Sequence, residues 1–321
     1  MAESDNEAAE MKTGKAESPA GKSEEKQAKE RKSVYALLEE LITASDLSMG
    51  EKKERLSRLV RIREKKVNIM LVEATGNGKS PTANALFDMG AARVGADLKT
   101  DSVTSYVLDN LTVWVCDIPA PGCGAKSGEK YNAMLVNKLS ETDENGNPLI
   151  DLVLVVLDVT SEDPGASLDL INKVLIPCLG EGRHGRILIG LNHADMAMKG
   201  KHWDAEKNEP DEVLRAYLKK KAESAEKRIR ETAGLTIKPV YYSTGYREEG
   251  GERRRPYNLT KLLYRIMKSI PKEKRLALAD NINPDNDMWL HDDKEENYRE
   301  EIKMDILIPL AAALEKEPGL R

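Results

Sequence analysis

The chain has 321 residues, of which 40% are apolar, 33% charged and 4% aromatic, and its net charge is −5. This acidic balance provides no domain-wide positive field of the kind that favours nucleic acid, so no strong nucleic-acid signal is present. The chain has three cysteines without paired metal-ligand spacing and four scattered histidines, which argues against a zinc site. An odd, small number of cysteines is typical of a protein in a reducing compartment. The sequence shows neither a signal peptide nor an apolar run of the roughly 20 residues that a transmembrane segment needs, which predicts a cytoplasmic protein.

The first part of the chain is expected to contain a tail followed by helices. Residues 1–32 are rich in Lys, Glu, Ala, Ser and Gly, which predicts a disordered charged tail. Apolar residues then recur at helical spacing on both sides of a break at Ser48-Met49-Gly50, which predicts a helical pair over residues 33–65.

Residues 66–275 alternate between apolar strands and helix-like segments. Asp109-Asn110 separates two of the strands and predicts a tight hairpin with one antiparallel strand. The expected fold is an α/β domain with a doubly wound, mainly parallel six-stranded sheet, whose ligands belong at the carboxyl ends of the strands. Residues 276–321 are expected to form an acidic C-terminal helical extension. The six predicted strands are Val67–Val72, Val103–Leu108, Leu111–Cys116, Asp151–Leu157, Ile187–Leu191 and Val240–Tyr242.

The loop after the first strand carries the strongest functional signal. Its residues are Thr75, Gly76, Asn77, Gly78, Lys79 and Ser80. A Gly-x-Gly-Lys-Ser loop at a helix start can wrap backbone N–H groups around a polyphosphate, with the lysine on the terminal phosphates and the serine hydroxyl on Mg²⁺. Glu73 stands where the full phosphate-loop pattern has its first glycine. The alternative is an ordinary glycine-rich turn before a helix.

Three further strand ends carry polar residues that suit a nucleotide. Asp117 after the third strand can hold Mg²⁺ through a water, although an aspartate opening a proline-rich turn is an alternative. After the fifth strand come Asn192 and Asp195, and a carboxylate there can accept hydrogen bonds from N1 and N2 of guanine; a helix cap is the alternative. Ser243 and Thr244 after the sixth strand have N–H groups that could meet guanine O6, or they form an ordinary loop.

In this order and spacing, the four features resemble the translation-factor-related P-loop GTPases, and within them the Era/septin-like bacterial small GTP-binding proteins. The resemblance covers roughly residues 66–275 and implies GTP or GDP with Mg²⁺ as the bound cofactors. In that family a threonine before the second strand closes over Mg²⁺. Thr100 is the candidate and Thr104 the alternative.

Five positions depart from the family pattern. Glu73 brings a carboxylate and a β-carbon close to the phosphates. Pro81 removes an N–H donor, although proline is tolerated in the first turn of a helix. Ala120 replaces a glycine and is followed by Pro121 instead of a water-orienting side chain, while His193 replaces a lysine that stacks on the base.

The predicted function is therefore a slow, Mg²⁺-dependent GTPase that acts as a molecular switch. Lys79 and Thr100 would be its catalytic residues, and Ser80, Thr100 and Asp117 its metal ligands. The alternative is a pseudo-GTPase that serves as an interaction module with weak or no hydrolysis. The expected partners are a guanine nucleotide and an unidentified protein or ribonucleoprotein, and a homodimer through the nucleotide-binding domain or the helices is left open.

Overall fold

The structure, a computed structural model, describes residues 33–73, 78–90, 92–94, 103–117, 125–161, 165–180, 185–247 and 253–315. The predicted tail over residues 1–32 lies outside these ranges. From Ser33 onward the chain forms one compact unit. The predicted division at residues 65/66 and 275/276 into a helical pair, a nucleotide-binding domain and an extension stays a prediction.

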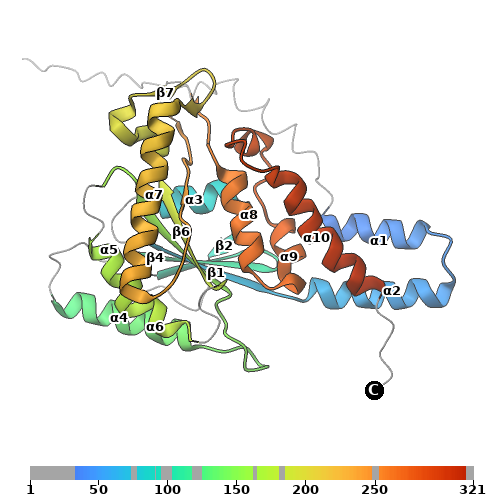
Figure 1. Cartoon of the computed structure of the whole chain (residues 1–321). Helices are drawn as coiled ribbons and strands as arrows, with labels where there is room; N and C mark the ends of the chain where they lie inside the picture. The colour runs from blue at the N-terminus through green and yellow to red at the C-terminus, as the bar shows by residue number, and fades with distance from the viewer. Residues whose placement is uncertain are drawn as a thin grey trace, which may run out of the picture. The chain divides into compact units, whose positions relative to one another are not determined.

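The elements are shown in chain order in Figure 1. The α-helices are α1 (Val34–Ala44), α2 (Met49–Arg63), α3 (Lys79–Leu86), α4 (Ala125–Ser140), α5 (Gly165–Leu170), α6 (Ile176–Cys178), α7 (Glu212–Ala233), α8 (Leu259–Ser269), α9 (Arg275–Asp280) and α10 (Tyr298–Glu315). The strands are β1 (Val67–Glu73), β2 (Arg93–Val94), β3 (Val103–Val107), β4 (Leu111–Asp117), β5 (Leu152–Asp158), β6 (Ile187–Asn192), β7 (Trp203–Asp204), β8 (Glu209–Pro210), β9 (Val240–Tyr241), β10 (Tyr246–Arg247) and β11 (Arg253–Arg254).

The main sheet has the strand order β2-β3-β4-β1-β5-β6-β9. All six predicted strands are in it, and β3 runs antiparallel to β4 through the predicted hairpin while β1, β4, β5, β6 and β9 pair in parallel. The two-residue strand β2, which the sequence pattern did not indicate, adds a seventh strand at the edge. This mainly parallel sheet flanked by helices confirms the predicted fold class.

The central strand β5 is buried on both faces, which explains why it is apolar from Leu152 to Leu157. In β5, Leu152, Leu154 and Val156 belong to one hydrophobic cluster, while Val153 and Val155 belong to the other. The first cluster is completed by α3, α8 and α9, and the second by α4, by α7 and by a π-helical turn between α5 and α6. Helices α7 and α8 therefore lie on opposite sides of β6 (Figure 1).

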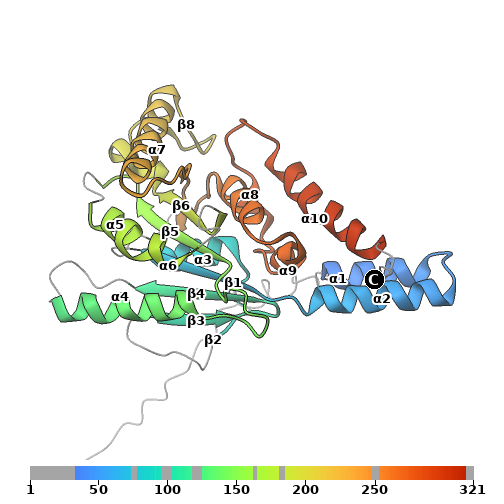
Figure 2. The same ribbon diagram turned by 60° about the horizontal axis from the view of Figure 1, so that its bottom comes forward.

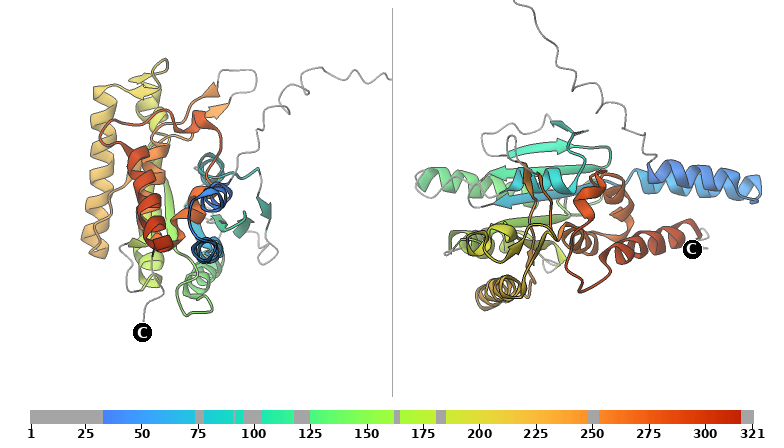
Figure 3. Two further views of the ribbon diagram at one scale, coloured as in Figure 1. Left: turned by 90° about the vertical axis from the view of Figure 1, so that its right-hand side faces the viewer. Right: turned by 90° about the horizontal axis from the view of Figure 1, so that it is seen from above.

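The helices α1, α2 and α10 extend beyond one end of the sheet, as Figures 2 and 3 show. Ser48, in the break that separated the two predicted helices, is the N-cap of α2 and forms a capping box with Glu51. The three helices share a small apolar cluster, and Arg58 Nη1 donates to the carbonyl oxygen of Leu314 at 2.7 Å. Among the helices that the structure describes, none has both the length and the apolar character required to cross a bilayer.

Candidate functional site

The carboxyl ends of five neighbouring strands meet at one edge of the sheet. Strand register aligns Glu73 at the end of β1 with Asp117 at the end of β4, and Asp158 at the end of β5 with Asn192 at the end of β6. The end of β9, at Tyr241, pairs with Leu191 beside them. Ligands of doubly wound sheets bind at this edge, and most of the predicted site residues lie on the loops that leave it.

Helix α3 begins at this edge, directly after β1. Its N-cap, Gly78, has a φ of 114°, which favours glycine. A β-carbon at Gly78 would lie 2.3 Å from Asn192 Nδ2, so glycine is required there for the phosphate-loop helix to approach β6. Lys79 is buried, with 5% of its surface exposed. The first N–H groups of a helix lack intrahelical partners, and Pro81 fits the first turn because it has no N–H to leave unpaired.

The loop after β6 contains the predicted base-selecting residues. Asn192 is fully buried against Gly78, and the backbone N–H of Ala194 donates to the carbonyl of Tyr242 at 3.0 Å. Asp195 is buried as well, with 4% of its surface exposed. Yet within the part of the chain that the structure describes, its carboxylate has neither a hydrogen bond nor an ion pair. Because no protein group among the described residues donates to this carboxylate, a ligand that donates hydrogen bonds would be stabilised by it.

His193 lies between the base-selecting residues and the phosphate loop. Its φ of 64° is in the left-handed region, and its Nδ1 atom is 3.4 Å from Asp158 Oδ1. The other side of the ring faces Gly78, since a β-carbon there would lie 3.7 Å from His193 Nε2. Burial alone would raise the pKa of Asp158, but hydrogen bonds from His193 and Thr160 outweigh it and hold that pKa below its ordinary value. The ring therefore sits beside a carboxylate that stays ionised.

The loop after β9 is closed by a two-way backbone pairing. Ser243 N–H donates to Tyr257 at 3.0 Å, and Tyr257 N–H donates back to Ser243 at 2.9 Å. Gly245 N–H donates to Ser243 Oγ at 3.2 Å. Gly245 has a φ of 67°, and a β-carbon on it would lie 2.3 Å from the carbonyl oxygen of Arg254. Ser243 is thus buried and Thr244 half-buried in a loop held from both sides.

Tyr242 connects the two ends of the site, and the sequence did not single it out. Its hydroxyl is 2.8 Å from Thr82 Oγ1 in α3, and both residues are fully buried. Gly190 in β6 provides the space, because a β-carbon on it would lie 2.7 Å from the Tyr242 ring. An isolated glycine in a strand often marks such a close approach, and this was the signal that could have indicated the contact.

The remaining predicted residues are only partly described. Thr75, Gly76, Asn77 and Thr100 lie outside the described residues, as do the departures Ala120 and Pro121. Asp117 is placed by its backbone at the end of β4, and the alternative Thr104 is the second residue of β3. The structure therefore brings Gly78, Lys79, Asn192, Asp195 and the Ser243–Thr244 loop to one edge. Ser80, next to Lys79, is exposed.

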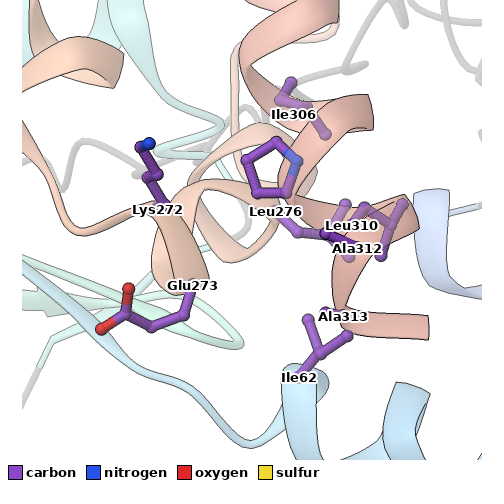
Figure 4. A pocket seen from close by; sticks show the side chains of 9 residues that line it. Ile62, Lys272, Glu273, Leu276, Ile306, Leu310, Ala312 and Ala313 are labelled. Carbon is purple, nitrogen blue, oxygen red and sulfur yellow. The ribbon is translucent and has the colours of Figure 1, made fainter. Parts of the chain in front are cut away.

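Metal ligands and cavities were also considered. Within the described ranges no group of three or more His, Cys, Asp or Glu side chains could hold a metal ion. One cavity, of about 220 Å³, lies between α2, α9 and α10 and is lined by Ile62, Leu276 and Leu310 among others (Figure 4). A second, of about 380 Å³, lies beneath α4 and is lined in part by Cys116 at the end of β4. Neither includes Lys79 or Asp195.

Comparisons with known proteins were made at the level of sequence and of structure. No family model and no curated protein sequence matches the chain. Among solved structures, a dimerization-deficient variant of Toc33 from Arabidopsis thaliana is similar at 16% identity and a TM-score of 0.40, covering 65% of this chain and 85% of that one. Toc33 in complex with Mg²⁺ and GMPPNP is similar at 17% identity and a TM-score of 0.38, covering 64% and 82%.

The G domain of the FeoB iron transporter of T. maritima is similar at 17% identity and a TM-score of 0.33, covering 64% of this chain and 98% of that one. Similarity at this level concerns the fold alone. The binding of Mg²⁺ and GMPPNP is an observation on Toc33 and not on this chain.

Proposed function

We propose that this chain binds a guanine nucleotide at the strand-end edge and is a slow, Mg²⁺-dependent GTPase that works as a switch. The observation that carries the proposal is Asp195, a residue with 4% of its surface exposed, whose carboxylate has no partner among the described residues and which lies three residues after Asn192. Guanine carries two adjacent donors, N1–H and the N2 amino group, that match one carboxylate, whereas adenine has no such pair. Asp195 therefore selects guanine.

The residues around Gly78 fit a polyphosphate and a magnesium ion. Gly78 forms a cradle that a β-carbon would fill, Lys79 lies buried at the start of α3, and Ser80 is exposed beside it. Lys79 holds the terminal phosphates, while Ser80, Thr100 and Asp117 are the proposed ligands of Mg²⁺. When bound, the ion neutralises charge on the phosphate oxygens.

The proposed roles of the other residues follow from their positions. The N–H groups of Ser243 and Thr244 orient the guanine O6, and Thr75, Gly76 and Asn77 provide phosphate-loop N–H groups. Hydrolysis is slow because Pro121 stands where a water-orienting side chain would follow Ala120. Segments 95–104 and 118–130 would report the γ-phosphate to a protein or ribonucleoprotein partner. Membership of the Era/septin-like group belongs to the same proposal.

A pseudo-GTPase is the second candidate, and one observation favours it. Glu73 and Asp117 occupy register positions on adjacent strands at the phosphate end of the site. Two carboxylates beside a polyphosphate repel it. In this case the chain would keep the scaffold and use its helices α1, α2 and α10 as an interaction module.

A nucleotide titration tests the proposal. Fluorescent GDP is titrated into the full chain with and without Mg²⁺, and phosphate release from GTP is measured in parallel. Lys79→Ala and Asp195→Asn should each weaken GDP binding about 10- to 150-fold, since each removes a charge-assisted hydrogen bond of roughly 1.5–3 kcal/mol. ADP should compete poorly with GDP for the wild-type protein, and its disadvantage should become smaller for Asp195→Asn.

Asp169→Asn is the matched control, because it removes one carboxylate that pairs with the exposed Lys173 at 2.9 Å. It should bind GDP like the wild type. GDP binding with no phosphate release would favour the pseudo-GTPase. No binding at millimolar nucleotide, or equal binding of ADP and GDP by the wild type, contradicts the proposal.

A further inference from the structure

A short segment after the main fold crosses the start of α8. We name residues 291–298 the C-terminal clip; they connect a 3₁₀ turn (Asn286–Trp289) to α10. Asp292 in the clip accepts the backbone N–H groups of Thr260 at 3.1 Å and Lys261 at 3.2 Å. These are N–H groups of the first turn of α8, which lack intrahelical partners. The clip therefore caps a helix to which it is not adjacent in sequence.

Asn258 is the residue through which the clip contacts the rest of the chain. It is fully buried and has a φ of 56°, a left-handed conformation that asparagine tolerates better than most residues. Its backbone N–H donates to His291 at 2.8 Å, and its side-chain oxygen accepts the N–H of Asp293 at 2.7 Å. Its Nδ2 atom is 3.0 Å from the carbonyl of Tyr241 and 3.3 Å from Asp293 Oδ2. Asn258 thus joins the clip to the end of β9.

Asp293 is held by buried polar groups. Its side chain is 5% exposed and lies 2.6 Å from Lys261 Nζ, whose side chain is 11% exposed. The Tyr298 hydroxyl donates to the other oxygen of Asp293 at 2.6 Å. Lys261 also faces the rings of Tyr241 and Tyr298 at 5.6 and 5.7 Å. With partners of this number and burial, Asp293 has one well-defined position.

This network ends at the loop proposed to meet the guanine base. Tyr241, whose carbonyl accepts from Asn258, precedes Ser243 by two residues, and Tyr257, which directly precedes Asn258, pairs with Ser243 in both directions. Asn258 therefore bonds Tyr241 directly, while its neighbour Tyr257 pairs with Ser243. If Asp293 moved, Asn258 would keep its bond to Tyr241 but lose the Asp293 N–H donor and the Asp293 carboxylate acceptor, which would weaken the support of the Ser243 loop.

We infer that Asp293 is a positioning residue for the base-side loop, acting through Asn258, and that the C-terminal clip couples occupation of the base site to α10. The part of this inference that concerns the nucleotide rests on the proposed function, whereas the support of the loop by Asp293 does not. Tyr298 is the first residue of α10, and the far end of α10 packs on α1 and α2. Because coupling between two sites is reciprocal, nucleotide binding should stabilise the clip as much as the clip stabilises binding.

The first experiment needs no nucleotide. Hydrogen exchange of the amides of Ser243, Gly245 and Tyr257 is measured by NMR in the full chain. Asp293→Asn and the milder Tyr298→Phe, which removes only one hydroxyl, should both speed exchange at these amides. Glu295→Gln is the matched control, since the Glu295 side chain also pairs with Lys261 at 2.7 Å but, within the described ranges, forms no hydrogen bond with Asn258. It should leave the three amides unchanged.

The second experiment separates positioning from general destabilisation. GDP, inosine diphosphate and inorganic pyrophosphate are titrated into each variant. Both nucleotides carry O6, so Asp293→Asn should weaken both about threefold to tenfold, the effect of one hydrogen bond, and leave pyrophosphate unchanged. Equal loss for all three probes would make Asp293 merely structural and overturn the inference.

The two proposals fail in different ways. If the wild type binds none of the three probes, the proposed function fails, while the amide exchange still decides whether Asp293 supports the loop. If Asp293→Asn does not fold, Tyr298→Phe provides the test. Unchanged exchange at Ser243, Gly245 and Tyr257 in Tyr298→Phe, and in Asp293→Asn where it folds, overturns the inference.

Discussion

The two ends of the candidate site are built differently. At the base end, Asn192, Asp195 and Ser243 are all buried, and the loops that carry them are tied to each other by the bond from Ala194 N–H to Tyr242. At the phosphate end, the sequence departs from the phosphate-loop pattern at Glu73 and Pro81. The base end therefore keeps the residues proposed to recognise a purine, while the phosphate end departs from the pattern proposed to hold and hydrolyse a triphosphate.

The difference also shows which residues are evidence of function. Asn192 lies against Gly78 and Ser243 pairs with Tyr257, so both would be retained for packing alone. Asp195 has no such explanation, because its carboxylate has neither a hydrogen bond nor an ion pair among the described residues. The proposed selection of guanine therefore depends on Asp195 far more than on the number of matching motifs.

The largest effect is expected at Gly245, at the base end. Gly245 and Gly234 have nearly the same φ, 67° and 69°, but a β-carbon on Gly245 would lie 2.3 Å from a backbone oxygen, whereas nothing lies within 4 Å of one on Gly234. Gly234→Ala should cost about 1 kcal/mol of unfolding free energy from backbone strain alone. Gly245→Ala should cost a further 1–3 kcal/mol, roughly the effect of overpacking, and should weaken GDP binding at least about tenfold. Urea unfolding and GDP titration measure both.

The comparison of these two alanine variants has a clear contrary outcome. Equal stability of Gly245→Ala and Gly234→Ala would show that the base loop can move away from Arg254 at little cost. The base end would then be no more firmly built than the phosphate end.

The sequence was sufficient for the fold and for the position of several candidate residues at one edge of the sheet, for a physical reason. Local sequence determines elements such as the continuous apolar strand Leu152–Asp158 and the Asp109-Asn110 turn. Their positions therefore follow from residue type and spacing. The strand-end rule then placed Lys79 and Asp195 at one edge. The two-residue strand β2 could not be predicted, since it depends on pairing with β3 rather than on its own sequence.

The support of the base loop was also beyond the sequence. Asp293 and Asn258 are 35 residues apart and meet only because the chain after α9 returns across α8. An aspartate in an acidic extension looks like solvated surface when its neighbours in space are unknown. Tyr242 and Thr82, which are 160 residues apart, were missed for the same reason.

At the phosphate end, two variants of Glu73 separate charge from shape. Glu73→Gln removes the negative charge and keeps the β-carbon, while Glu73→Gly removes both. If repulsion limits affinity, both should bind GDP more tightly, by up to about tenfold for a partly screened charge. If backbone freedom limits affinity, only Glu73→Gly should bind GDP more tightly. The titration of fluorescent GDP at two salt concentrations distinguishes these cases, because salt reduces only the effect of charge. Unchanged affinity in both variants would remove Glu73 from the explanation of the phosphate end.

The smallest effect is expected at Glu295, a partly exposed residue of the C-terminal clip. Hydrogen bonds from Lys261 and then Lys219 lower the pKa of Glu295 from 4.5 to about 2. Because the folded-state pKa is depressed, Glu295 should stabilise the fold above pH 4.5, and this contribution should be lost as the pH falls from 4.5 towards 2. Its side chain is 45% exposed, so the contribution should be no more than about 1 kcal/mol.

Urea unfolding at pH 7 and at pH 3 measures this contribution. Glu295→Gln should lower the unfolding free energy at pH 7, and its difference from the wild type should shrink at pH 3. Glu300→Gln is the control, since Glu300 pairs with Lys303 at 3.3 Å on the exposed side of α10, and it should match the wild type at both values. A difference for Glu295→Gln that is the same at pH 7 and pH 3 would mean that the ionisation of Glu295 does not contribute to stability. The local support of the base loop is expected from the buried pair of Asp293 and Lys261 in either case.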